Sequence, residues 1–127
     1  MPLGDFVGLL MLLLQGKITI SLNMETWNLL FYRLKKKNIA GKPAFFEKMQ
    51  FDWDGPYPKS PELSHYLNCL SMFGVLVTTS PRFQEYKLDE KHTPILKKKY
   101  EALDETAKLF LDHAVKIAME EFTKRAK

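Results

Sequence analysis

The chain has 127 residues, of which 46% are hydrophobic and 27% are charged. This composition is that of one globular domain and excludes a disordered chain. The single cysteine, Cys69, excludes an internal disulfide framework and indicates a reducing compartment, so we expect a cytoplasmic protein. The net charge of +4 permits binding to nucleic acid but does not require it.

An apolar run near the N-terminus, residues 6–14, predicts a buried helix. It is far shorter than the ~20 residues that span a bilayer, and Asp5 precedes it where a signal peptide would carry positive charge. We therefore expect no membrane association and place the first helix at Leu3–Gln15, ended by Gly16. The alternation in Lys17–Ile20 then indicates a short strand.

The second helix is predicted at Met24–Lys37, with Ser21 or Asn23 as its N-cap. Its last turns collect four cations: Arg33, Lys35, Lys36 and Lys37. Cations at a helix C-terminus complement the helix dipole, so a solvated helix end is one interpretation of this cluster. Contact with phosphate groups is the other.

The segment that follows, Asn38–Pro58, contains no long helical pattern. It is predicted to begin as a loop, to form a helical turn over Ala44–Gln50 and to become extended over Phe51–Trp53. Asp54–Pro58 holds two prolines and a glycine, so this stretch must turn.

The third helix begins after Ser60, a good N-cap that is followed by Pro61 at the first helical position. It ends at Gly74, and its apolar residues have helical spacing: Leu63, Tyr66, Leu67 and Leu70. Two strands of a β-hairpin are then predicted at Val75–Thr79 and Phe83–Leu88.

The remaining pattern, Thr93–Arg125, is helical, with a break expected near Asp104–Glu105. Its apolar residues alternate steps of four and three: Leu96, Tyr100, Leu103, Ala107, Phe110, Ala114 and Ile117. Such a stripe can form a coiled-coil seam between two chains, or it can pack on its own domain.

This order of elements predicts a mostly α-helical fold with a small β-hairpin, namely a winged helix-turn-helix with an additional C-terminal helix or helices. Residues 1–92 would form the winged-helix domain. Residues 93–127 would form a C-terminal helical extension, packed on that domain or acting as a dimer seam, within a single domain overall. The connection between the second and third helices is much longer than the usual turn of this motif.

The stretch Phe51-Asp52-Trp53-Asp54-Gly55-Pro56-Tyr57, followed by a Ser-initiated helix and by Gly-Val-Leu-Val, carries a resemblance. Over about Phe51 to Leu88 the chain is similar to the YwgA-like proteins and, more distantly, to the Panacea domains, which are phage-associated and antitoxin-linked. Those families have Tyr-x-x-Gly-Pro-Tyr-Ser before the helix, whereas Pro58-Lys59 intervene here. The resemblance implies a winged-helix fold, with a structural motif made of Trp53, Gly55, Pro56 and Tyr57. It leaves DNA and protein open as partners, because some Panacea domains resemble antitoxins or adaptors that bind a protein.

In a winged helix the third helix enters the major groove, so we predict helix 60–73 as the recognition helix and hairpin 75–88 as the wing. Outward side chains and nearby cations give the candidate DNA contacts: Lys59, Ser60, Ser64, His65, Asn68, Arg82, Lys87, Arg33 and Lys36. Asn and His can contact base edges. However, the helix has no Arg or Lys of its own, and Glu62 would face phosphates unfavourably.

Other polar patterns have simpler structural explanations. Asp52 and Asp54 can form an acid–base or metal-binding pair, but beside Gly-Pro they more simply hydrogen-bond to the turn. His65 and Cys69 have a zinc-binding spacing, yet no second pair closes the site. Four aromatic residues can stack on bases or, more simply, belong to the core: Trp53, Tyr57, Tyr66 and Phe73. No nucleotide-binding or hydrolase motif occurs, so we expect no catalytic residue, no cofactor and no metal.

The leading hypothesis is a non-enzymatic transcriptional regulator that binds double-stranded DNA as a homodimer formed through the C-terminal helix. The alternative is a protein–protein interaction module, antitoxin- or adaptor-like, that uses the same fold without binding DNA. Convergence of Lys59, Arg82, Lys87 and the Arg33–Lys37 cluster on one face with the third helix would favour DNA. Interruption of that face by Glu62 and Glu85 would favour a protein partner.

Overall fold

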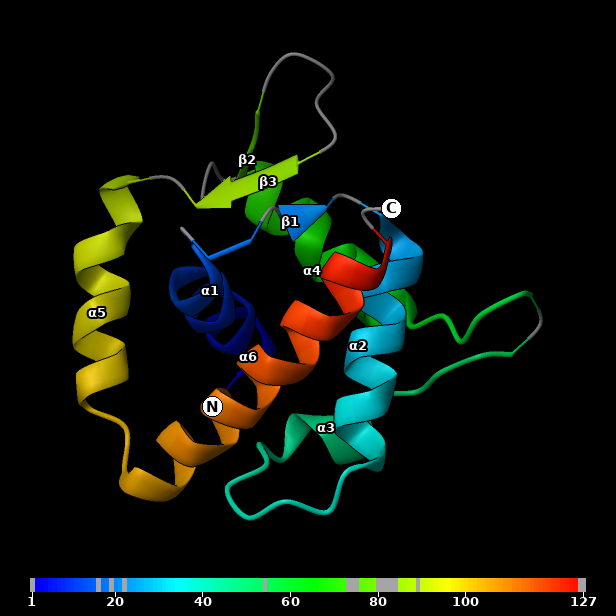
Figure 1. Ribbon diagram of the computed structural model, residues 1–127, viewed down its shortest axis with the longest axis horizontal. Helices are drawn as coiled ribbons and strands as arrows, with labels where there is room; N and C mark the ends of the chain where they lie inside the picture. The colour runs from blue at the N-terminus through cyan, green and yellow to red at the C-terminus, as the bar shows by residue number, and fades with distance from the viewer. Residues whose placement is uncertain are drawn as a thin grey trace.

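Helices dominate the computed structural model of the chain (Figure 1). The structure describes residues 2–15, 17–18, 20–21, 23–53, 55–72, 76–79, 85–88 and 90–125. Its helices are α1 (Leu3–Leu14), α2 (Met24–Lys36), α3 (Phe45–Lys48), α4 (Pro61–Met72), α5 (Thr93–Glu101) and α6 (Glu105–Arg125). Its strands are β1 (Ile20–Ser21), β2 (Leu76–Thr79) and β3 (Glu85–Leu88), and a 3₁₀ turn at Glu90–His92 precedes α5.

Helix α1 is the centre of the molecule, and the prediction of a buried first helix is confirmed. It contacts α4, α5, α6 and β3, and it lies behind α6 in Figure 1. Phe6 is fully buried and makes edge-to-face contacts with Phe31 and Phe46, with ring centroids 5.7 and 5.4 Å apart. Full burial of each such side chain stabilises the fold by roughly 1.5–3 kcal/mol. Among the described helices, none is long and apolar enough to cross a membrane.

Helix α6 has 21 residues and packs against both α1 and α2. The ring of Phe122 meets the buried indole of Trp27 at 5.3 Å. Of the heptad stripe, four residues are buried and three are half-buried: Leu96, Phe110, Ala114 and Ile117, then Tyr100, Leu103 and Ala107. In the structure the stripe therefore packs on its own domain.

Polar caps fix the ends of these helices where the sequence predicts them. Asn23 Oδ1 accepts a hydrogen bond from the Glu25 amide at 2.9 Å and begins α2. Ser60 Oγ accepts one from the Leu63 amide at 3.3 Å and begins α4. The break between α5 and α6 is also confirmed, because Asp104 Oδ1 accepts a 2.8 Å bond from the Ala107 amide.

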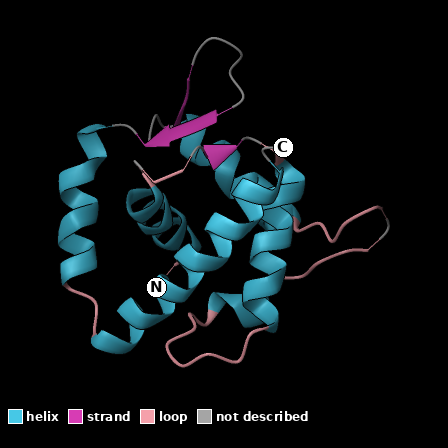
Figure 2. Cartoon of the chain, viewed as in Figure 1, coloured by secondary structure: helices cyan, strands magenta, loops and turns pink. Residues whose placement is uncertain are grey.

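The strands form a small sheet in which β3 lies between β1 and β2 and is antiparallel to both (Figure 2). The strands contain two, four and four residues. β3 contacts α1 and β2 contacts α4, so the sheet covers one end of the helical core. The turn predicted at 80–82 lies outside the described residues.

The predicted fold class, a winged helix-turn-helix with a C-terminal extension, is wrong. In the part of the chain that the structure describes, six α-helices form most of the fold, and the strands, of two to four residues, form only a small sheet at one end of it. Residues 37–60, which include α3, separate α2 from α4, so no short turn joins these helices. Helix α6 places Phe110 and Phe122 in the same core as α1, so the C-terminal helices form one helical body with the rest of the described chain.

Candidate interaction surface

Two of the side chains predicted to contact DNA face the protein interior. Ser60 is buried, and its amide donates to Asn28 Oδ1 at 2.7 Å while its hydroxyl caps α4. Ser64 is half-buried, with its hydroxyl 3.9 Å from Met24 Sδ. Both serines therefore contact residues of α2, although the sequence placed Ser64 on the outward side of the helix.

The exposed side of α4 is acidic and neutral. His65 and Asn68 are exposed as predicted, and they lie beside the exposed side chains of Glu62 and Tyr66. Cys69 Sγ lies 3.5 Å from His65 Nε2. Within the described residues, no group of three or more His, Cys, Asp or Glu side chains could hold a metal ion. This helix therefore offers hydrogen-bonding groups to a partner without any charge that attracts phosphate.

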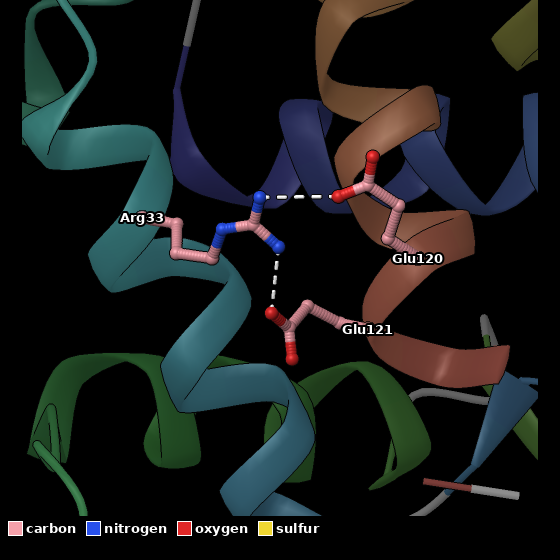
Figure 3. Close-up of polar contacts among 3 residues, drawn as sticks. All are labelled: Arg33, Glu120 and Glu121. Atoms are coloured by element: carbon pink, nitrogen blue, oxygen red, sulfur yellow. Dashed lines mark hydrogen bonds and ion pairs between the residues drawn. The ribbon is translucent and has the colours of Figure 1, made fainter. Parts of the chain in front are cut away.

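Arg33 forms ion pairs with two glutamates of the same chain. Its guanidinium joins α2 to α6 through Glu121 at 2.6 Å and Glu120 at 3.1 Å (Figure 3). Glu121 is only 5% exposed, whereas Glu120 is 63% exposed. Burial opposes the charged form of Arg33, but hydrogen bonds and attraction from both carboxylates outweigh it and raise its pKa above the ordinary value. The guanidinium that was predicted to contact phosphate is therefore already paired with two carboxylates.

The other cations of the Arg33–Lys37 cluster separate in the structure. Lys35 Nζ donates to the carbonyl of Met49 and lies 5.9 Å from the ring centroid of Phe51. Lys36 is exposed, and its ammonium lies 5.5 Å from the ring centroid of Tyr32. Lys37 is exposed at the end of α2. Within this cluster, Arg33 therefore contacts α6, whereas Lys35 and Lys36 belong to a surface beside residues 49–53.

The other cations predicted to contact DNA are Lys59, Lys87 and Arg82, and only the side chain of Lys59 is described by the structure. Lys59 is exposed directly before this helix, with its ammonium 5.1 Å from the ring centroid of Tyr57. Lys87 lies in β3. Arg82 lies outside the described residues. Among the predicted cations whose side chains the structure describes, only Lys59 lies next to the predicted recognition helix.

Residues 51–53 and 55–59 run side by side as a narrow ribbon that extends past α2 (Figure 1). Asp52 and Lys59 pair across it through two backbone hydrogen bonds of 2.8 and 2.9 Å. Gly55 and Pro56 are exposed, and Tyr57 is half-buried. Their motif therefore shapes the ribbon, and the stretch appears as pink loop beside the helices in Figure 2.

Trp53 lies on this ribbon and is 58% exposed. Tyr66, on α4, is 42% exposed. The prediction that these aromatic residues belong to the core is wrong, because the core already contains Trp27 and a cluster of phenylalanines from α1, α2, α3 and α6. Phe73, from the same predicted set, lies outside the described residues.

Three aromatic rings meet where the ribbon lies against α2. The ring of Tyr32 is 5.4 Å from both Phe51 and Trp53, and both contacts are edge-to-face. Alternate residues of an extended strand share a face, so Phe51 and Trp53 point to α2 while Asp52 points away. Lys35 and Lys36 lie next to these rings. We call the five residues the Trp53 surface: Tyr32, Lys35, Lys36, Phe51 and Trp53.

The sequence pattern did not identify Tyr32 or Phe51 as part of a site, and it placed Lys35 only in a cluster of cations at the end of the second helix. A signal was present in α2, because Tyr32 and Lys36 are four residues apart and lie off its buried stripe. The ribbon residues come from a separate segment, and nothing in their local spacing predicts which helix they contact. Only the tertiary fold brings the two segments together.

Comparison of the chain with protein-family models, with curated proteins and with solved structures found no match. The resemblance of residues 51–88 to the YwgA-like and Panacea families therefore stays a prediction.

Proposed function

We propose that this chain is a non-enzymatic protein-interaction module that binds a partner protein through the Trp53 surface. The observation that carries the proposal is the 58% exposure of Trp53 in a chain whose other tryptophan, Trp27, is fully buried. An exposed indole keeps a large apolar area in water, and covering it with a partner is favourable. Tryptophan and tyrosine are also the residues that most often dominate the energy of protein interfaces.

The surface is held in shape before any partner arrives. The backbone bonds between Asp52 and Lys59 fix the ribbon, and Tyr32 belongs to the capped helix α2. Trp53 is further restrained by its edge-to-face contact with Tyr32. A side chain that is already ordered loses little conformational entropy on binding. The free energy gained by burying it is therefore offset less by the cost of ordering it.

A protein partner accounts for the described surface better than duplex DNA. Arg33 is held by two carboxylates, and Ser60 and Ser64 face the interior. The exposed face of α4 carries Glu62 without a neighbouring cation among its own residues. Duplex DNA affinity comes largely from phosphate contacts, and these features leave few of them on the described residues of and around α4. We further propose that the partner is met in the cytoplasm, which the single cysteine supports.

The test is a selection of short peptides from a random display library against the folded chain, with Trp53→Ala as the matched control. We expect peptides that bind the native chain and lose about tenfold or more in affinity for the variant. Mixed duplex DNA is titrated in parallel at low and at physiological salt. Tight DNA binding at low salt, together with selected peptides that bind both chains equally, would contradict the proposal.

A further inference from the structure

The charge around the Trp53 surface is uneven. Lys35, Lys36 and Lys37 follow one another at the end of α2, and the exposed Lys48 of α3 comes directly before Met49, whose carbonyl Lys35 binds. Glu47, the acidic residue of α3, is paired with Lys42 at 3.1 Å. A partner that covers Trp53 therefore meets an excess of positive charge at one end of this surface.

The two faces of the ribbon differ in charge. Asp52 and Lys59 are cross-strand partners on the face that points away from α2, and their opposite charges offset one another. Phe51 and Trp53 occupy the other face, where the neighbouring charges come from α2. The nearest acidic residue on the same side of α2 is Glu25, which is seven residues, or about 10 Å, from Tyr32.

Lys36 keeps its hydrogen-bonding capacity. Its ammonium lies over the ring of Tyr32 at 5.5 Å, and among the described residues it makes no ion pair. An ammonium over a ring face is held in place while its N–H donors remain available. A carboxylate can therefore approach Lys36 without displacing an existing acidic partner.

These charges also exclude one ligand that aromatic clusters commonly bind. Three rings in contact can surround a quaternary ammonium or a methylated lysine. Here Lys35 and Lys36 already place their ammonium groups against two of the three rings. A cationic ligand would be repelled by both, so the cluster selects against positive charge.

We propose that the partner segment bound by the Trp53 surface is an acidic peptide that places an apolar side chain against Trp53 and Phe51 and a carboxylate against Lys36. The proposal rests on the proposed function and adds the chemistry of the partner. Charge complementarity favours this occupant, because the apolar and cationic parts lie side by side. A nucleic-acid strand needs successive stacking rings along a cationic track, and the ribbon offers one strongly exposed ring.

The experiment measures fluorescence anisotropy with three probes on the full chain. One is a short peptide with a central phenylalanine flanked by glutamates, the second replaces those glutamates by glutamines, and the third is an oligothymidylate of similar length. We expect the glutamate peptide to bind about tenfold more tightly than the glutamine peptide at low salt, with the difference shrinking at high salt. Lys36→Gln should weaken the glutamate peptide about threefold.

A charge-matched control is Lys98→Gln, because Lys98 is exposed on α5, away from α2 in Figure 1. This variant should bind as the native chain does. Equal binding of both peptides, lost in Trp53→Ala, would overturn the acidic partner and leave the proposed function standing. Failure of both peptides, or equal weakening by the two lysine variants, would also overturn the acidic partner. Tighter binding of the oligothymidylate would overturn this inference and the proposed function together.

Discussion

At the scale of single residues, Arg33 shows how a cation that the sequence places on a helix end can be structural. Its guanidinium spans α2 and α6 and meets Glu121, whose side chain is almost fully buried. Removing one member of such a pair leaves the other charge buried without a partner. The resulting loss of folding stability is larger than the stability that the intact pair contributes. Arg33 thus stabilises the packing of α6 against α2, the helix that carries Tyr32 and Lys36.

We predict that Arg33→Met lowers the free energy of unfolding by about 1–3 kcal/mol, less than for a fully buried pair because Arg33 is one-third exposed. Urea denaturation followed by fluorescence measures the change. Glu120→Gln is the control, and it should have the smaller effect because Glu120 is mostly exposed. Equal losses for the two variants would show that burial of Glu121 does not matter.

At the scale of elements, the loop between α2 and α3 determines how this part of the chain docks on α6. Gly41 has a φ of +86°, and a Cβ atom there would lie 2.4 Å from the backbone oxygen of Thr106. Lys42 Nζ donates to the carbonyls of Lys35 and Lys37 at 2.9 and 3.0 Å, so it caps the end of α2. The loop therefore joins the ends of two helices through close backbone contacts.

We predict that Gly41→Ala costs about 1–3 kcal/mol, because it combines a strained φ with a backbone clash. Gly55→Ala, in the ribbon, should be tolerated, since its Cβ would meet only the mobile end of Lys59 at 3.5 Å. Thermal unfolding of both variants provides the comparison. A larger loss for Gly55→Ala than for Gly41→Ala would contradict this account of the loop.

The sequence predicted most element boundaries because they depend on local chemistry. The caps at Asn23, Ser60 and Asp104 act on amides two or three residues away, so their effect is readable along the chain. The candidate surface was not predictable, because Tyr32 and Trp53 meet only after α2 and the ribbon pack together. Ser60 illustrates the difference: its cap was predicted, whereas its burial against Asn28 depends on tertiary contacts.

At the scale of the whole molecule, α6 belongs to the same core as α1 and α2. Phe110 is 1% exposed and contacts the rings of Phe6 and Phe46 at 6.0 and 5.8 Å. The sequence left the position of this helix open, because the stripe has the same spacing whether it packs inward or between chains. The stripe packs into the molecule's own core, with four of its seven residues buried.

We predict that Phe110→Ala lowers the free energy of unfolding by about 3–5 kcal/mol, whereas Leu109→Ala, at a neighbouring residue that is 58% exposed, changes it little. The midpoint of unfolding should not depend on protein concentration for the native chain or for either variant, because the contacts are internal. A midpoint that rises with concentration and falls for Phe110→Ala would instead place this residue in an interface between chains.

Binding at the Trp53 surface can be followed through the two indole N–H signals of the ¹⁵N-labelled chain, from Trp27 and Trp53. A peptide selected for binding is titrated while both signals are followed by NMR, and Trp53→Phe assigns them. Since Trp27 is fully buried and Trp53 is exposed, we predict a saturable shift of the Trp53 signal and an unchanged Trp27 signal. A saturable shift of His65 and Asn68 amides in α4, with the Trp53 signal unmoved, would contradict the claim that the Trp53 surface is the binding site.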